Sequence, residues 1–176
     1  MDAERIFQKL LQNQIGQLVM GQLKLVQPAI FPTTYDQSLG LRKLIEMAVG
    51  PDNINNINPD ITQKRFPLKG TDVRSVKLRV EPFLNGETSE QIVKRLAGTV
   101  PGFGNTGDLA GFLHDHPEEV EKWGWVVALS EDSRWTNPDG LVCVPYASVH
   151  GVRRYFYLVY FRYRFHSGFG VLVLCE

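Results

Sequence analysis

Apolar residues recur at helical spacing in the first fifty residues. Over residues 3 to about 20 they lie three or four positions apart, which predicts an amphipathic helix. Its apolar positions are Ile6, Leu10, Leu11, Ile15, Leu18 and Val19. Pro28 and Pro32 then interrupt the chain, and a second helix is predicted between Asp36, its N-cap, and Gly50, its stop.

The period of the pattern changes after residue 73. Apolar and charged residues alternate over 76–80, which is typical of a half-buried strand. Thr88 and Gln91 form a capping-box signature for a short helix. Two further helical segments are predicted, one capped by Asp108 and one with Pro117 in its first turn.

After Gly124 the apolar runs have the length of strands. They are WVVALS (125–130), LVCVPYASV (141–149), RYFYLVYF (154–161) and FGVLVLCE (169–176), with the turn-forming TNPDG (136–140) between the first two. The predicted order is therefore two helices, then strand, helix, helix and four strands. This order indicates an α+β fold with a helical start.

The composition supports a folded chain with a substantial core. Of its 176 residues, 43% are hydrophobic and 22% are charged, which excludes a disordered segment. No apolar run approaches the ~18 residues of a membrane-spanning helix, so membrane insertion is not expected. The first 25 residues lack the apolar region of a signal peptide. The formal net charge of +0 argues against a generic polyanion binder.

The residues from Thr136 to Cys175 have an anomalous composition. They include no Lys, Gln, Glu, Met or Trp, although these five types make up almost a fifth of the whole chain. Strands disfavour Lys and Glu, but this preference does not explain the loss of Gln, Met and Trp. The same tract holds five of the six tyrosines and four arginines. Tyr and Arg mixed on a sheet are typical of a protein-binding surface, and a stiff aromatic sheet with a solvated basic face is the alternative.

Alternation within this tract separates two sets of side chains. One set is predicted to be fixed by the core: Val142, Val144, Ala147, Val149, Phe156, Leu158 and Phe161. The intervening set is predicted to point the other way: Cys143, Tyr146, Ser148, His150, Tyr155 and Tyr157. The following run RYRFHS (162–167) abandons alternation, as a loop of presented side chains would.

These features resemble the variable proteins of diversity-generating retroelements, which are binding proteins of phages, bacteria, archaea and archaeal viruses. The resemblance rests on SRW (133–135), VxVPxAxVxG (142–151), RRYFYL (153–158) and FGVLVLCE (169–176). In that family a reverse transcriptase copies a template repeat and mutates its adenines, so that AAY codons become NNY codons. Because NNY codons cannot encode Lys, Gln, Glu, Met or Trp, that process would leave the gap described above.

The resemblance implies an α+β, C-type lectin fold of the formylglycine-generating-enzyme-like subclass over 73–176. Residues 1–72 are then an N-terminal helical extension, and the variable region covers about 136–176. The strand at 76–80 is expected to lie beside the strand at 170–174. Display on a cell or virion surface is a further implication of the resemblance alone.

Carried over by position, the resemblance implies a ligand-binding surface within the variable region. Its residues are Tyr146, Ser148, His150, Val152, Tyr155, Tyr157, Val159, Tyr160, Arg162, Tyr163, Arg164 and His166, with Cys143, Phe165 and Ser167 as weaker candidates. The expected partner is a macromolecule, and a protein on another cell or virus is the first choice. The chain is expected to be a binding protein rather than an enzyme, with no cofactor and no metal.

Other functions fit parts of the sequence less well. A formylglycine-generating-type oxidoreductase needs a reactive cysteine pair, whereas Cys175 lies in an apolar strand and a buried Cys is usually a small hydrophobe. A single-stranded nucleic-acid-binding module would stack bases on the tyrosines, but the neutral charge and the missing lysines weigh against it. His114 and His116 flank Asp115, yet such near neighbours diverge on a helix, so solvated imidazoles at a helix end are expected.

Overall fold

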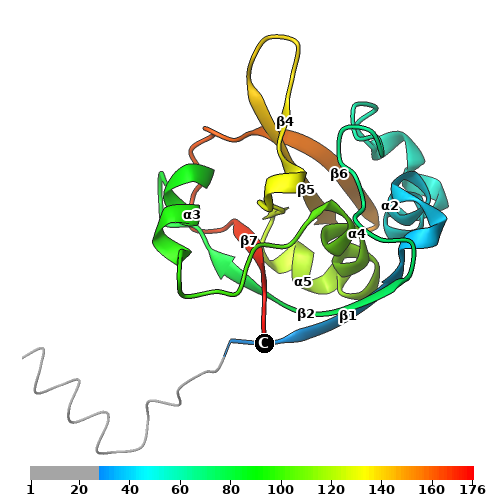
Figure 1. Ribbon diagram of the computed structural model, residues 1–176, viewed down its shortest axis with the longest axis horizontal. Coiled ribbons are helices and arrows are strands. Elements are labelled where there is room, and N and C mark those ends of the chain that lie inside the picture. Colours follow the sequence, from blue (N-terminus) through cyan, green and yellow to red (C-terminus); the bar gives the residue numbers. More distant parts are fainter. Residues whose placement is uncertain (1–27) are drawn as a thin grey trace, which may run out of the picture.

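The structure is a computed structural model that describes residues 28–176. Within this part, seven strands form one mixed sheet in the order β1-β2-β7-β3-β5-β4, and β6 pairs with β5 (Figure 1). The strands are β1 (Phe31–Asp36), β2 (Val73–Pro82), β3 (Val126–Val127), β4 (Trp135–Thr136), β5 (Val142–His150), β6 (Arg153–Tyr160) and β7 (Gly170–Leu174). The amphipathic helix predicted over residues 3 to 20 lies outside the described residues.

Helices connect the strands, so the α+β class is confirmed. The α-helices of the described part are α2 (Leu41–Val49), α3 (Ser89–Leu96), α4 (Thr106–Asp115) and α5 (Pro117–Lys122). Three short 3-10 helices accompany them: η1 (Gln37–Leu39), η2 (Pro51–Asn56) and η3 (Glu131–Ser133). Thr88 and Gln91 form the predicted capping box of α3, and Pro117 occupies the first turn of α5 as predicted.

Two predicted helix caps are wrong in detail. Asp36 accepts the backbone N–H of Ser38 and so caps η1, whereas α2 begins after Gly40. Asn105 caps α4, and Asp108 is its reciprocal partner, accepting the Asn105 backbone N–H at 3.0 Å. In both cases a short polar side chain forms a hydrogen bond with a nearby backbone N–H group. Several neighbouring residues of the sequence can do this equally well, so the sequence alone does not identify the capping residue.

The described part of the N-terminal segment is not purely helical, because residues 31–36 form strand β1. This strand pairs antiparallel with β2 along its whole length. Pro32 indicates a break in the sequence, but β1 is the edge strand of the sheet, where a residue without an N–H is tolerated. Leu44 and Ile45 of α2 lie in the same hydrophobic core as strand residues. Residues 28–72 are therefore integrated with the sheet.

Strands β2 and β7 lie side by side, as expected. They pair antiparallel from Leu78 opposite Leu174 to Pro82 opposite Gly170. On its other side β7 pairs in parallel with β3, where Val126 is the partner of Gly170. The last strand of the chain is thus inserted between two strands that precede it, in the interior of the sheet (Figure 1).

Hydrophobic cores fill both faces of the β5–β6 hairpin. Ala147 and Phe156 are cross-strand partners and belong to a core that α2 and α4 complete. Val144 and Val159 are also partners and belong to a second core on the other face. Because cross-strand partners share a face, burial on both sides breaks the predicted division into one buried and one presented set. Cys143 shares the face of Ala147 and is only 5% exposed, so its predicted outward direction is wrong.

Candidate binding surface

Five of the predicted ligand-binding residues lie on one face of the β5–β6 hairpin. Tyr146 is the cross-strand partner of Tyr157, and Ser148 is the partner of Tyr155. His150 follows two residues after Ser148, so it lies on the same face. These five side chains line an open depression of about 380 Å³. The predicted presented set is therefore found on one face except for Cys143, which lies on the opposite face.

Trp125 connects this depression to the neighbouring strands. Its ring is stacked against that of Tyr146, with the centroids 4.2 Å apart, and against that of Phe169, with the centroids 4.6 Å apart. The corresponding interplanar angles are 23° and 5°. Stacked rings of this kind add about 0.5–1.5 kcal/mol per pair beyond the area they bury, so Trp125 is held firmly in place.

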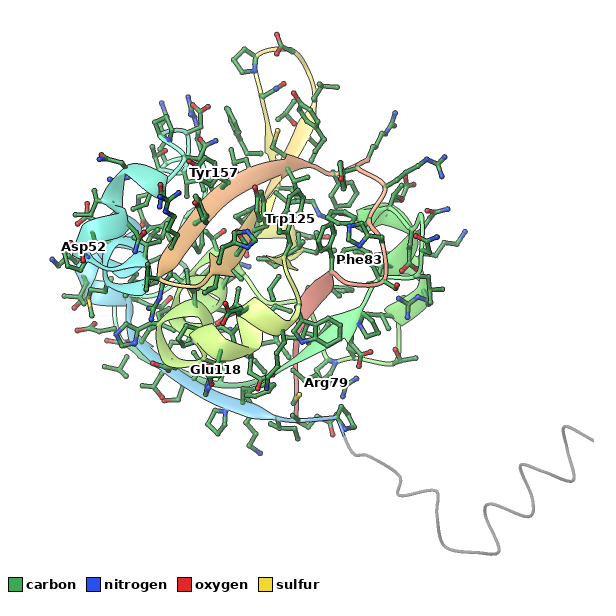
Figure 2. All side chains as sticks on the ribbon, turned by 180° about the vertical axis from the view of Figure 1, so that it is seen from behind. Asp52, Arg79, Phe83, Glu118, Trp125 and Tyr157 are labelled. Carbon is green, nitrogen blue, oxygen red and sulfur yellow. The ribbon has the colours of Figure 1, made fainter. Side chains whose placement is uncertain are left out.

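Aromatic side chains continue from Trp125 along the hairpin, and we call the whole set the aromatic row. Its members are His150, Tyr155, Tyr157, Tyr146, Trp125, Phe169 and His166. From Tyr146 the centroid spacings are 6.4 Å to Tyr157, then 6.0 Å to Tyr155. A final spacing of 5.7 Å leads to His150. Figure 2 shows Trp125 and Tyr157 near the middle of one face of the molecule.

The row also extends into the loop over residues 161–169. The ring of His166 lies 3.9 Å from that of Phe169. Tyr163, another predicted binding residue, lies beside the row with its ring 5.7 Å from Trp125. The loop thus places two predicted binding residues, Tyr163 and His166, against Trp125 and Phe169 of the row.

Phe165 anchors this loop to the core. It is 1% exposed and stacks on Phe83 with a centroid distance of 4.1 Å. Its backbone N–H donates to the Glu87 carbonyl at 2.9 Å, and its carbonyl accepts the Gly86 N–H at 2.7 Å. Phe165 is therefore a framework residue, and the side chains on either side of it are presented to solvent.

The remaining predicted residues divide into exposed and buried groups. Exposed in the β5–β6 turn and the loop are Val152, Arg162, Tyr163, Arg164, His166 and Ser167. Val159 is 8% exposed and lies in the second core, against which Trp125 and Tyr146 of the row pack. Tyr160 and Cys143 are cross-strand partners on the opposite face of the hairpin. The predicted ligand-binding residues therefore lie on two separate surfaces, one on each face of the hairpin, and some of them lie in the core.

Trp125 and Phe169 are the members of the row that sequence reasoning missed. Each comes directly before a strand, and each was assigned to a buried apolar run. Because β3 and β7 are parallel, with Val126 opposite Gly170, the residues that precede these partners lie side by side. An aromatic residue before each of two short apolar runs is the signal that could have found the pair.

The phenol group of Tyr146 is neutral near physiological pH. Burial raises the pKa of Tyr146, and the nearby Tyr157 and Tyr163 add to this rise. Neutral hydroxyls both donate and accept hydrogen bonds, and the rings offer apolar area at little cost in side-chain entropy. The row can therefore contact mixed polar and apolar surfaces of another molecule.

Positive charge lies at both ends of the row. Arg153 adjoins the β5–β6 turn, and Arg162 and Arg164 lie in the loop. All three are exposed, and none forms an ion pair within residues 28–176. At the turn, the Glu121 carboxylate is engaged by the Gly151 N–H at 3.0 Å. The three guanidinium groups are thus available to acidic groups of a partner.

The histidines near the end of α4 do not converge on a common point. The Nδ1 atom of His114 lies 2.8 Å from a carboxylate oxygen of Asp115, whereas the Nε2 atom of His116 lies 3.0 Å from the Pro32 carbonyl oxygen. Among the described residues, no group of three or more His, Cys, Asp or Glu side chains is arranged to hold a metal ion. The same part of the chain has no helix with the length and apolarity needed to cross a bilayer.

The comparisons with known proteins give no relative. No family model, no curated protein and no solved structure matches this chain.

Its two cysteines are free thiols, Cys143 on β5 and Cys175 directly after β7. Strand β3 separates β5 from β7 in the sheet.

Proposed function

We propose that this chain is the hypervariable binding protein of a diversity-generating retroelement, with a C-type lectin fold, and that its aromatic row and adjoining loop bind a protein. One observation carries the proposal. The tract that lacks Lys, Gln, Glu, Met and Trp supplies every member of the row except Trp125, together with the exposed loop beside it. A compositional gap in the tract that carries this surface is what targeted rewriting of the tract would leave.

The strand arrangement supports the fold assignment. The antiparallel β2–β7 pair, the helices between β2 and β3, and the β5–β6 hairpin follow the order that the resemblance implies. The pairing of β2 with β7 also brings the two ends of the proposed lectin domain together.

The hairpin suits a surface whose side chains change. The row stands on paired strands, and the opposite face carries core residues such as Ala147 and Phe156. Substitutions at exposed row positions then alter the contacts offered to a partner without reshaping the backbone, and little ordering is required on binding. A central Tyr or Trp can contribute about 2 kcal/mol or more to an interface.

The contacts within the row favour a protein over single-stranded nucleic acid. A base stacks on a ring that has an open face. Trp125, the largest ring of the row, is already stacked against both Tyr146 and Phe169. The unpaired arginines lie at the ends of the row, where acidic side chains at the edge of a protein epitope would meet them.

The flanking DNA provides the direct test. We expect a template repeat nearby that matches the codons of residues 136–176 almost perfectly, together with a reverse transcriptase gene. Mismatches between the two copies should fall at template adenines. Mismatches spread evenly over all four template bases, or the absence of a repeat, would refute the retroelement origin.

Sequencing this locus from many individuals of one population tests the surface. Substitutions should concentrate at the half-buried Tyr155 and Tyr157 of the row and at the exposed Arg162. The matched control positions are Ala147 and Phe156, which lie in the same strands but in the core, and they should stay constant. Equal variation at core and surface positions would contradict the assignment, and salt-sensitive binding of single-stranded DNA by purified protein would favour the nucleic-acid alternative.

A further inference from the structure

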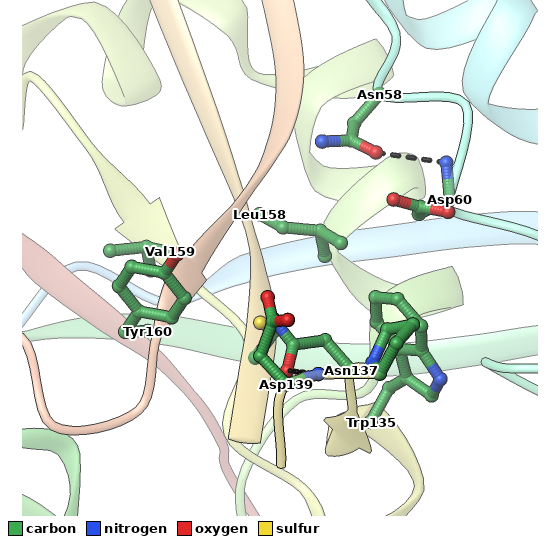
Figure 3. Close-up of a pocket in the computed structure, with 10 residues that line it drawn as sticks. Asn58, Asp60, Trp135, Asn137, Asp139, Leu158, Val159 and Tyr160 are labelled. Carbon is green, nitrogen blue, oxygen red and sulfur yellow. Dashed lines mark hydrogen bonds between the residues drawn. The ribbon is translucent and has the colours of Figure 1, made fainter. Parts of the chain in front are cut away.

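A separate cavity lies on the other face of the β5–β6 hairpin, where Cys143 and Tyr160 are partners. Its volume is about 470 Å³, within the range of roughly 300–1,000 Å³ that small-ligand sites occupy. The loop after η2, the β4–β5 hairpin and strand β6 all contribute to its lining. Figure 3 shows this cavity.

Aromatic rings form two of its walls. Tyr160 lines one side and Trp135 lines the other, with Asp139 between them in Figure 3. Leu158 adds an apolar side chain at the back. The ring faces of Trp and Tyr carry negative charge density, so such walls attract cations as well as apolar groups.

The charged groups of the cavity are acidic. Asp60 and Asp139 contribute carboxylates, and no Lys or Arg belongs to the lining. Burial raises the pKa of the Cys143 thiol at the cavity, and the negative charge of Asp60 raises it further. The Asp139 carboxylate accepts no hydrogen bond and forms no ion pair within residues 28–176. The hydrogen bond between Asp139 and the Asn137 side chain is donated by the backbone N–H of Asp139.

The fold already places a cation against the same wall from outside. The guanidinium of Arg65 lies over the Trp135 ring, 4.3 Å from its centroid, and pairs with Asp60. Arg65 itself does not line the cavity. The ring of Trp135 therefore already makes one cation–π contact, while Tyr160 and Asp139 have no cationic partner within residues 28–176.

We propose that this cavity binds an organic cation, an ammonium group with alkyl substituents, between the rings of Tyr160 and Trp135 and beside the Asp139 carboxylate. The group comes either from a small quaternary amine or from a methylated lysine side chain. The site lies on the opposite face of the hairpin from the aromatic row, and its charge is opposite to that of the arginines at the ends of the row. Tyr160 and Asp139 lie in the tract that the proposed function assigns to rewriting, so the cation site is a property of this copy of the tract.

The test compares choline with its neutral isostere 3,3-dimethyl-1-butanol, using the full-length protein. Binding is followed by NMR through the indole N–H signal of Trp135. We expect choline to shift that signal with saturation and the neutral alcohol to bind at least fivefold more weakly, which corresponds to about 1 kcal/mol of cation–π and charge interaction. A trimethyllysine peptide titrated in parallel distinguishes the two sources of the cation.

Variants assign the binding to this cavity. Asp139→Asn should weaken choline binding about fivefold, and Tyr160→Ala should abolish it. Asp52→Asn makes the same charge change on η2 outside the cavity and should leave choline affinity unchanged, as should Tyr157→Ser in the row. Equal affinity for choline and the alcohol, no shift with either cation, or loss of binding in Tyr157→Ser would overturn the proposal.

Discussion

Two neighbouring aromatic residues of β6 have opposite roles. Phe156 is fully buried in the core that α2 and α4 complete, whereas Tyr157 lies half-buried in the aromatic row. Successive side chains of a strand point to opposite faces, so one residue fixes the hairpin and the next one offers a contact. Phe161 and Leu158, also predicted as framework, pack partly buried against the two cores.

We expect Phe156→Ala to lower the free energy of unfolding by roughly 3–5 kcal/mol, as truncation of a buried aromatic does. Tyr157→Ala should cost less than half as much, because its ring keeps contact with solvent. Urea denaturation of both variants measures the difference. Similar losses at the two positions would show that Tyr157 supports the core and that the row is not a free surface.

Alternation predicted which β5 and β6 residues after Pro145 share a face, but it was wrong for Val144 and Cys143 before it, and it could not say how deeply each face is buried. Tyr146, Ser148 and Tyr155 lie together as predicted, because strand register follows from a period of two. Val159 and Cys143 follow the same period and are nevertheless buried. A core on each side of a sheet removes the polar–apolar contrast that reveals burial in a sequence.

At the scale of elements, the N-terminus of α4 joins three parts of the chain. Asp108 is fully buried and accepts the Tyr35 hydroxyl of β1 at 2.9 Å and the Arg74 Nε of β2 at 2.9 Å. The sequence indicated a cap at Asp108. It could not indicate these two partners, because each is distant along the chain and pairing depends on β1, which was not predicted.

Asp108→Asn should lower the free energy of unfolding by roughly 3–5 kcal/mol, because it leaves the Arg74 charge without its partner in a partly buried position. Urea denaturation measures the loss. Asp72→Asn is the control, since Asp72 is exposed and its side chain forms no ion pair within residues 28–176. A loss below 1 kcal/mol would mean that the network does not hold α4 against β1 and β2.

Glu87 makes the attachment of α3 dependent on pH. Burial opposes its charge, but hydrogen bonds from Arg95 and the Leu84 N–H, together with the Arg95 charge, outweigh burial and lower the pKa of Glu87. A carboxyl group whose pKa is lower in the folded state stabilises the fold above its ordinary value of 4.5. This contribution is lost as the pH falls through the lowered pKa.

Wild-type protein should therefore have a higher free energy of unfolding than Glu87→Gln near neutral pH. This stability gap between the two proteins should close in acid as Glu87 becomes protonated. Denaturant titrations at a series of pH values follow the gap. Glu118→Gln on α5 is the matched control, because Glu118 is exposed and forms no ion pair among the described residues. A gap that stays constant down to the acid transition would contradict the role of the Glu87 charge.

At the scale of the whole molecule, β7 completes the sheet. It lies between β2 and β3, and its Val171, Leu172 and Val173 are fully buried. We expect a chain that ends at residue 168 to remain unfolded, because its sheet lacks an interior strand and both cores are open. Circular dichroism and hydrogen exchange measure this. Removal of Glu176 alone is the control and should leave the fold intact.

If the gene is rewritten as proposed, the interior position of β7 limits which copies give a folded protein. A copying error that shifts the reading frame between residues 136 and 169 also removes β7, since β7 follows these residues. Such a product cannot close its sheet, and it is exposed to proteolysis before it can occupy a partner. Under the proposed rewriting, only in-frame copies would give a protein whose sheet is complete.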